Sequence, residues 1–489
     1  MPIKEAVLER AVARCRERGV VIPTFAQMRD PAKVPKQVRA RLKEVGLWDV
    51  DPVNLFRISW KNEPAAKGGL YGEGNWIELP SGLTGVEARI VGLVGKWFPT
   101  GAHKVGAAFG CIVPRLVSGQ FDPTSQKAVW PSTGNYCRGG AFDCALLGCH
   151  AVGILPEEMS PERFEWLSQI GAEVIATPGC ESNVKEIYDK CWEIRRTRPD
   201  CVIFNQFEEF GNAAWHYHVT GDAVEHAFQR LRSAPGSDGG RLRLAAYVSA
   251  TGSAGTIAAG DYLRTRFPHL RVVAVEALQC PTLLSCGFGG HRIEGIGDKH
   301  IPWIHNVRNT DVVVAVDDEQ CLALMRLFNE SEGQAFLIRQ GVALAFVQQL
   351  PLVGISGICN LVAAIKTAKL FDLDGRDVIV TPLTDSMELY QSRVNEQRKL
   401  HGPYSQATAG RHFGRYLEAV ATDHMRELSH AERKALHNFK YFTWVEQQGR
   451  TADELRRLWD PDFWTENFAQ VEEWDRLIEQ FNSRVATLS

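Results

Sequence analysis

The feature that most constrains the fold of this chain is a regular alternation of short apolar segments with longer amphipathic segments, beginning near Trp76. Short apolar runs bounded by polar or glycine-rich residues predict buried strands, and strands that alternate with helices form parallel sheets covered on both faces. The predicted strands are Arg89–Val94, Lys127–Trp130, Ala151–Leu155, Glu173–Ala176, Leu244–Ser249, Val272–Glu276 and Asp377–Thr381. The sequence therefore predicts an α/β protein built on parallel sheets.

The same pattern divides the 489 residues into three parts. Residues 1–72 form an N-terminal helical extension, with helices predicted at Lys4–Gly19 and Pro31–Leu47. Residues 73–401 carry the alternation and form the main body. Residues 402–489 lose the strand pattern and form a C-terminal helical extension rich in charge and tryptophan. Because a linker would be poor in aromatic residues, we expect this last part to dock, either as a stabilising element or as a cover over a cleft.

Composition and charge limit the partners. The formal net charge of −3 gives no reason to expect nucleic acid or an anionic membrane as a partner. The first residues lack the apolar core of a signal peptide, and no window approaches the roughly 18 apolar residues of a membrane span. The 12 cysteines include no Cys-x-x-Cys pair, which predicts reduced, mostly buried thiols and no metal site. We therefore expect a cytoplasmic protein without a bound metal.

Small and polar residues gather where several predicted strands end, which is where α/β folds bind ligands. The first such junction runs from Phe98 to Gly106 and places Lys104 at the start of an apolar helix. A single lysine is usually a solvated surface residue. At a glycine-flanked turn facing a cleft, however, a partly desolvated amine becomes a nucleophile.

Three further junctions have the composition of an anion site or a ring-binding site. Ser132-Thr133-Gly134-Asn135 could bind an anion or simply cap a helix. The run Gly252–Thr256 follows an apolar strand and precedes a helix, which suits a phosphate, whereas its glycine spacing does not fit a dinucleotide fingerprint. The last junction presents Asp385 and Ser386, either of which could meet a heterocycle nitrogen. Together the four junctions suggest one phosphate-bearing cofactor in one cleft.

In their order along the chain, these segments resemble the fold-type II pyridoxal-phosphate (PLP) enzymes, especially the cysteine synthase and cystathionine β-synthase group. The similarity covers residues 73–394, and its most specific part is Pro156–Arg163 followed by Gly171-Ala172-Glu173. Other matching segments are Glu78–Ser81, Phe98–Lys104, Ser132–Asn135, Asn205–Phe207, Gly252–Thr256, Glu294–Gly297, Gly354–Gly357 and Asp385–Tyr390, with Asn212, His216 and Thr220-Gly221. The resemblance implies a two-lobed body similar to the tryptophan synthase β-subunit, with PLP as the cofactor.

The resemblance also implies residue roles. Lys104 would be the Schiff-base lysine and the base at the substrate α-carbon, Asn135 would bond the cofactor 3′-oxygen, and Ser386 would meet the pyridine nitrogen. The cofactor phosphate would be held by Gly252, Ser253, Ala254, Gly255 and Thr256. The substrate carboxylate would be bound by Ser132, Thr133 and Gln206.

The activity that the resemblance implies is β-replacement or β-elimination on a small amino acid, as in a cysteine synthase or a cysteine desulfhydrase. The reaction would pass through an α-aminoacrylate formed from an activated serine or cysteine derivative, and family enzymes are commonly homodimers. Two alternatives stay open: a serine or threonine dehydratase-type deaminase, and a binding homologue without turnover. The first needs a proton donor for the hydroxide leaving group that the sequence does not place. The joint presence of Lys104, Asn135 and Ser386 argues against the second.

The chain also departs from the cysteine synthase pattern. His103 precedes the lysine, as in the tryptophan synthase β-subunit, and could either help to hold the phosphate or cap the turn. Tyr136-Cys137-Arg138 replaces smaller residues after the asparagine and should reshape the substrate pocket or narrow its entrance. The segment Gln334–Val353 and the C-terminal extension exceed the minimal family body.

Overall fold

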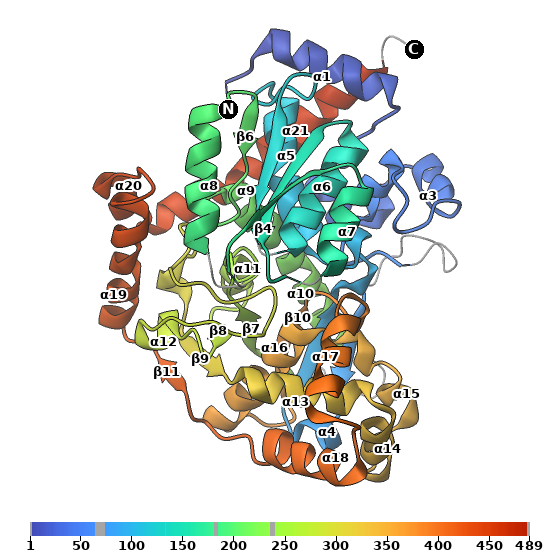
Figure 1. The fold of residues 1–489 in the computed structure, drawn as a ribbon, viewed down its shortest axis with the longest axis vertical. Coiled ribbons are helices and arrows are strands. Elements are labelled where there is room, and N and C mark those ends of the chain that lie inside the picture. Colours follow the sequence, from blue (N-terminus) through green and yellow to red (C-terminus); the bar gives the residue numbers. More distant parts are fainter. Residues whose placement is uncertain are drawn as a thin grey trace.

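The computed structural model describes residues 2–63, 74–132, 134–159, 161–179, 184–234 and 240–486, and they fold into two sheets surrounded by helices (Figure 1). The larger sheet has the strand order β1-β2-β10-β7-β8-β9-β11, and the smaller sheet has the order β5-β4-β3-β6. Neighbouring strands pair in parallel, except for β1 and β11, which pair antiparallel at the two edges of the larger sheet. The predicted α/β fold on parallel sheets is confirmed.

The seven predicted strands coincide, within a few residues at each end, with β2, β3, β4, β5, β7, β8 and β10. The strands of the larger sheet are β1 (Trp76–Leu79), β2 (Arg89–Val94), β7 (Arg243–Ala250), β8 (Arg271–Ala277), β9 (Val312–Val316), β10 (Asp377–Leu383) and β11 (Met425–Glu427). The strands of the smaller sheet are β3 (Lys127–Pro131), β4 (His150–Pro156), β5 (Glu173–Thr177) and β6 (Cys201–Ile203).

One prediction about strands is wrong. The sequence after Gly402 was expected to contain no strand, but β11 (Met425–Glu427) lies there and pairs with β9, Met425 opposite Val314. The reason is that β11 is short and largely polar, so it carries no apolar signal. It forms because the edge of β9 offers free backbone groups for pairing.

The helices of the first half are α1 (Glu5–Glu17), α2 (Phe25–Arg29), α3 (Lys36–Leu42), α4 (Ser81–Thr84), α5 (Lys104–Val117), α6 (Asn135–Leu147), α7 (Pro161–Gln169), α8 (Val184–Thr197), α9 (Phe210–Trp215) and α10 (Gly221–Arg232). Those of the second half are α11 (Ala258–Arg266), α12 (Thr282–Ser285), α13 (Asp318–Asn329), α14 (Ser331–Arg339), α15 (Leu344–Val347), α16 (Ile355–Leu370), α17 (Gln391–His401), α18 (Gln406–Phe413), α19 (His430–Lys440), α20 (Ala452–Arg457) and α21 (Pro461–Ala486). The helix expected at Pro31–Leu47 is shorter, because Pro35 stands at the N-terminus of α3.

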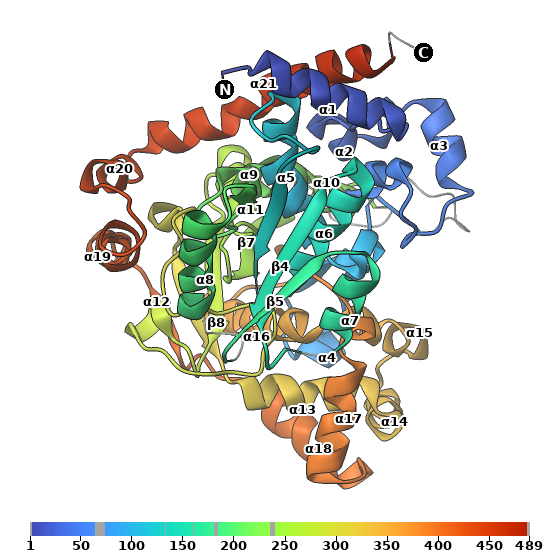
Figure 2. The ribbon, with the colours of Figure 1, turned by 45° about the horizontal axis from the view of Figure 1, so that its top comes forward.

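The C-terminal helix α21 packs on the main body and on the N-terminal extension. Figures 1 and 2 both show it running alongside α1, next to α5. Its apolar face joins one continuous hydrophobic core with residues of α1, α2, α5 and α6, and its members there include Trp464, Phe468, Trp474 and Phe481. The side chain of Asp475 accepts hydrogen bonds from the backbone N–H groups of Phe25 and Ala26 at the start of α2. The two extensions therefore share a core with α5 and α6 of the main body.

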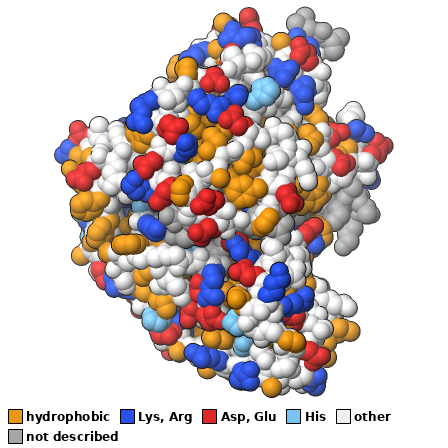
Figure 3. All heavy atoms as spheres, in the orientation of Figure 1, with side chains coloured by type: hydrophobic (Ala, Val, Ile, Leu, Met, Phe, Trp, Pro, Cys, Tyr) orange, Lys and Arg blue, Asp and Glu red, His pale blue; other side chains and the backbone are white. Residues whose placement is uncertain are grey.

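The surface is of mixed charge. On the face in Figure 3, acidic and basic side chains are interspersed, in keeping with the formal net charge of −3. In the part of the chain that the structure describes, no single helix is both long and apolar enough to cross a membrane. One pair of helical segments, Leu344–Leu352 and Ile355–Leu370, meets those criteria jointly but is bent by 118°. The eleven cysteines among the described residues are free thiols, and most of them are buried.

Candidate active site

A cleft of about 610 Å³ lies where the predicted junctions meet. It brings together the turn before α5, the turn before α6, the loop after β7 and the end of β10. Among the described residues, its lining is His103, Lys104, Ser132, Asn135, Tyr136, Gln206, Phe207, Ala250, Gly252, Ser253, Ala254, Thr256, Gly295, Ile296, Gly297, Asp298, Thr384 and Asp385. Of the residues that the sequence predicts for a site, Thr133 lies outside the described residues, and Gly255 and Ser386 do not line the cleft.

Lys104 projects into this cleft from the first turn of α5. The chain reaches it through a tight turn in which Thr100 and Gly101 have φ values of 68° and 69°. Left-handed backbone is uncommon for a β-branched residue, so the surrounding structure holds this turn in place. The Lys104 amine donates hydrogen bonds to Ser253 Oγ (2.8 Å) and Gln206 Oε1 (3.0 Å). The amine is thus directed at the loop after β7, in reach of a ligand bound there.

The loop 252–256 has the backbone geometry of an anion-binding loop, and it is called the anion cradle below. Ala254 has a φ of 60°, which lets successive N–H groups turn toward one side. Within the described part of the chain, none of the backbone N–H groups of residues 252–256 donates a hydrogen bond, although Ser253 and Ala254 are buried. Buried N–H groups are almost always paired in folded proteins. Unpaired donors ahead of helix α11 are therefore suited to a phosphate group.

Position 255 requires glycine because the side chain of Asn212 lies against it, and not because it lines the cleft. A Cβ atom on it would lie 1.9 Å from Asn212 Oδ1. The Asn212 amide donates to the Gln206 carbonyl (2.9 Å) and to Ser253 Oγ (3.0 Å). The absence of a side chain at Gly255 thus lets Asn212 brace the loop that carries Gln206 against the loop 252–256.

His103 connects the loop 252–256 to the end of β10. Its Nδ1 lies 3.1 Å from the Thr384 carbonyl and its Nε2 lies 3.2 Å from Thr256 Oγ1. Burial, together with the nearby charge of Lys104, lowers the pKa of His103 to about 3. The ring is therefore neutral, and it can donate to Thr384 and accept from the Thr256 hydroxyl. This placement supports a role beside the anion cradle as well as in the turn.

A buried carboxylate organises the end of the cleft near Asn135. Asp385 Oδ2 accepts hydrogen bonds from Asn135 Nδ2 (2.7 Å) and Tyr390 Oη (2.6 Å). Burial raises the pKa of Asp385 to about 6, against the lowering effect of these two bonds. Ser386 is also buried, and its Oγ has no hydrogen-bond partner among the described residues. Asp385 therefore faces the cleft, and the adjacent Ser386 keeps a buried hydroxyl that is unpaired among the described residues.

The remaining predicted residues come from the turn before α6 and from the first turns of that helix. Ser132 Oγ accepts a hydrogen bond from the backbone N–H of Gly134 (3.0 Å). Tyr136 lines the cleft, and its hydroxyl donates to the Phe204 carbonyl (3.1 Å). Arg138 does not line it, because its guanidinium packs over the rings of Trp48 and Trp166. Of the substitutions expected to shape the pocket, Tyr136 is thus in position and Arg138 is not.

One segment that lines the cleft was not among the predicted site residues. Residues 295–298 line the cleft, and Gly295 and Gly297 have φ values of 92° and 77°. The two glycines were a visible signal, since a Gly-x-Gly pair outside any helix marks unusual backbone. Just before them, Glu294 forms a buried ion pair with Arg163 of α7 (2.7 Å). This pair ties the segment to the side of the cleft that carries Ser132 and Asn135.

Known proteins resemble this chain over the segment that carries the cleft. Residues 97–385 match the model of a family described as "Pyridoxal-phosphate dependent enzyme". A probable cysteine synthase of Bacillus subtilis is 29% identical over 295 residues, 60% of this chain and 85% of that protein. Cysteine synthase B of Campylobacter jejuni is 31% identical over 295 residues, 60% of this chain and 87% of that protein.

The fold has solved counterparts as well. The structure of a cysteine synthase from Entamoeba histolytica superposes with a TM-score of 0.57 at 20% identity, covering 70% of this chain and 92% of that one. At this identity the likeness concerns the fold alone. The matched family segment, however, contains the lysine turn, the anion cradle and the end of β10. The chain therefore belongs to the family of pyridoxal-phosphate dependent enzymes, and its cofactor is PLP.

Proposed function

We propose that this protein catalyses β-replacement or β-elimination on a small amino acid, an activated serine or cysteine derivative. The observation that carries the proposal is the position of the Lys104 amine, 2.8 Å from Ser253 Oγ of the loop 252–256 and 3.0 Å from Gln206. A nucleophilic amine next to a phosphate cradle is what a PLP site requires. The cysteine synthase names of the relatives support the choice of reaction.

The residues present fit PLP. The unpaired N–H groups of 252–256 match a phosphate, the Lys104 amine matches an aldehyde, and the unpaired Ser386 hydroxyl matches a ring nitrogen. Asn135, already oriented by Asp385, has a second N–H for the 3′-oxygen. When bound, the cofactor supplies an electron sink that makes the α-proton of an attached amino acid acidic.

The chain itself then supplies binding and proton transfer. Lys104 Nζ accepts the α-proton, since it is the basic group that projects into the cleft. Ser132, Thr133 and Gln206 bind the substrate carboxylate. The neutral ring of His103 places no second positive charge beside Lys104.

Product analysis tests the proposal. Purified protein loaded with PLP is incubated with O-acetylserine, O-phosphoserine, cysteine or threonine, each with and without sulfide. Formation of cysteine from a serine ester and sulfide identifies replacement, and release of pyruvate or sulfide without a second substrate identifies elimination. A protein that releases ammonia from threonine alone, and is inert toward the other three, would instead be a dehydratase.

The structure also predicts the effect of filling the space at Gly255. In Gly255→Ala, the new methyl group displaces Asn212 and breaks its bonds to Gln206 and Ser253. Losing such buried bonds costs about 1–3 kcal/mol, so we expect PLP affinity to fall by about tenfold or more. Titration of the apoprotein with PLP measures this. Gly82→Ala is the control, because nothing lies within 4 Å of its Cβ position; equal affinity in the two variants would contradict the assignment of the cradle.

The proposal extends to the assembly and the compartment. We infer a homodimer, as the family resemblance implies, which sedimentation velocity tests directly. We also infer a reducing, cytoplasmic setting. It is supported by the eleven free thiols of the described residues, of which Cys286 is the exposed one.

A further inference from the structure

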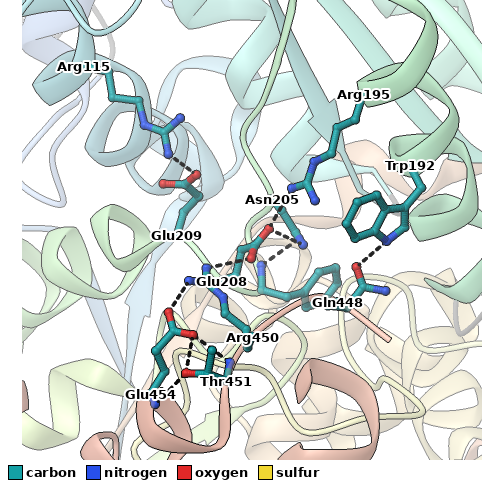
Figure 4. Close-up of polar contacts among 11 residues, drawn as sticks. Arg115, Trp192, Arg195, Asn205, Glu208, Glu209, Gln448, Arg450, Thr451 and Glu454 are labelled. Carbon is teal, nitrogen blue, oxygen red and sulfur yellow. Dashed lines mark hydrogen bonds and ion pairs between the residues drawn. The ribbon is translucent and has the colours of Figure 1, made fainter. Parts of the chain in front are cut away.

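The C-terminal extension contacts the loop that carries Gln206, here called the Gln206 loop (residues 205–209). Figure 4 shows Arg450, which precedes α20, reaching Glu208 of this loop. Arg450 Nη2 lies 2.8 Å from Glu208 Oε2, and Arg450 Nη1 lies 3.3 Å from Glu454 Oε1 in α20. Arg450 is thus held by its own segment while it binds the body.

Glu208 passes this contact to the lining of the cleft. Its Oε1 accepts a hydrogen bond from Asn205 Nδ2 (3.3 Å), and Asn205 Oδ1 accepts one from the backbone N–H of Phe207 (3.1 Å). In the chain, Gln206 and Phe207 stand between Asn205 and Glu208, and both residues line the cleft. Beyond Glu208, Glu209 pairs with Arg115 of α5 (2.5 Å), which anchors the other end of the loop (Figure 4).

The same extension supports Phe207 from behind. Trp444 donates from its indole N–H to the Ile301 carbonyl (2.8 Å), and its ring lies 5.7 Å from that of His300. The ring of His300 lies 5.2 Å from Phe207, whose carbonyl accepts a hydrogen bond from the Ile304 N–H (3.3 Å). The extension thus reaches the Gln206 loop by a polar route through Arg450 and by an aromatic route through Trp444.

We propose that Arg450 is a positioning residue for the amino-acid substrate: by holding Glu208, it fixes the Gln206 loop and so determines how the cleft receives the carboxylate and side chain of the substrate. The proposal rests on the proposed function for the identity of that substrate. No described residue after Asp385 lines the cleft, so the extension acts through the loop and not as a cover. The matched family segment ends at residue 385, so Arg450 lies outside it.

The ion pair between Glu208 and Arg450 is partly buried. The side chains of Glu208 and Arg450 are 14% and 30% exposed, so water screens the pair less than a surface pair. Arg195 also approaches Glu208, at 3.4 Å. If Arg450 is lost, Glu208 therefore keeps Arg195 of α8 as a charged partner, so the protein should stay folded. Glu208 can then move toward Arg195 and away from Asn205.

The test compares Arg450→Ala and Arg450→Lys in the full-length holoenzyme. Arg457→Ala is the matched control, because Arg457 forms an exposed pair with Glu466 inside the extension, at 64% and 63% exposure. Hydrogen–deuterium exchange of peptides spanning 204–210 reports on the loop directly and needs no turnover. Steady-state kinetics with O-acetylserine and O-phosphoserine separates KM from kcat.

We expect exchange in 204–210 to rise by about tenfold in Arg450→Ala, as for the loss of about 1.4 kcal/mol of local stability. KM for the amino acid should rise about five- to tenfold with kcat within about twofold, since the loss falls on binding. Arg450→Lys should restore part of both changes, and Arg457→Ala should match the wild type. Unchanged exchange, or faster exchange with unchanged KM and unchanged preference between the two esters, would overturn the proposal. A wild-type protein that converts none of the tested amino acids would refute the proposed function, and the exchange result would still decide whether Arg450 holds the loop.

Discussion

Lys104→Ala is expected to abolish turnover and to remove covalent attachment of the cofactor. A single acid–base group contributes about 10²–10⁴-fold to a reaction rate. Lys104 is proposed both to bind the cofactor covalently and to accept the α-proton, so the loss should exceed that range. The position of the amine, bonded to Ser253 and Gln206 on the cleft wall, is the structural basis of this expectation. Absorbance spectra of the purified variant and its initial rates measure the two effects.

Borohydride reduction supplies the matching positive test. Treatment of the wild-type holoenzyme should fix the cofactor on Lys104, and peptide mass mapping locates the adduct. Lys96→Ala is the control, because Lys96 lies near the same turn but pairs with Glu388 (3.5 Å) and does not line the cleft. An adduct on any other lysine, or a Lys104→Ala protein with normal turnover, would show that the lysine was wrongly assigned.

Truncation after His401 should prevent the protein from folding stably. It removes Trp464, Phe468, Trp474 and Phe481, which are buried in the same core as α1 and α5. Truncation of one buried Phe or Trp to alanine typically costs about 3–5 kcal/mol, whereas a whole domain is stable by about 5–15 kcal/mol. We therefore expect insoluble or protease-sensitive protein, measured by soluble yield and limited proteolysis.

Single substitutions in the C-terminal extension test whether its buried aromatic side chains, and not its exposed ones, stabilise the protein. Trp474→Ala should lower the free energy of unfolding by about 3–5 kcal/mol in denaturant titrations. Phe442→Ala should change it by less than about 0.5 kcal/mol, because Phe442 is 55% exposed. A truncated protein that is soluble, loaded with PLP and thermally unchanged would show that the extension contributes nothing to the core.

The sequence predicted best those elements whose signal is local. Strand β3 was expected at Lys127–Trp130 and lies at Lys127–Pro131, because an unbroken apolar run has few alternatives to a buried strand. The same holds for the junction at Lys104, where glycine, histidine and lysine stand together in one turn. In contrast, β11 depends on pairing with β9, more than 100 residues earlier in the chain, and no local pattern announces it.

The unpredicted parts of the site depend on geometry that sequence does not encode locally. The run Asp385-Ser386 does not reveal which side chain lines the cleft; in the fold Asp385 does, and Ser386 keeps a buried hydroxyl without a partner among the described residues. Residues 295–298 belong to no strand–helix junction, so the rule that predicted the other walls did not apply to them. The route from Arg450 to Gln206 spans more than 200 residues of chain, and only the folded structure reveals it.

The shared core of α1 and α21 has a consequence for biosynthesis. Arg484 of α21 pairs with Glu5 of α1 across 479 positions of sequence. A helix that is synthesised late is therefore required to close the core that an early helix begins. Until α21 has been synthesised, the apolar faces of α1, α2 and α5 that it covers stay exposed, and the nascent chain is prone to aggregation. A premature stop between Asp385 and α21 should then be detected by protein quality control as a folding failure, even though every described residue lining the cleft has already been made.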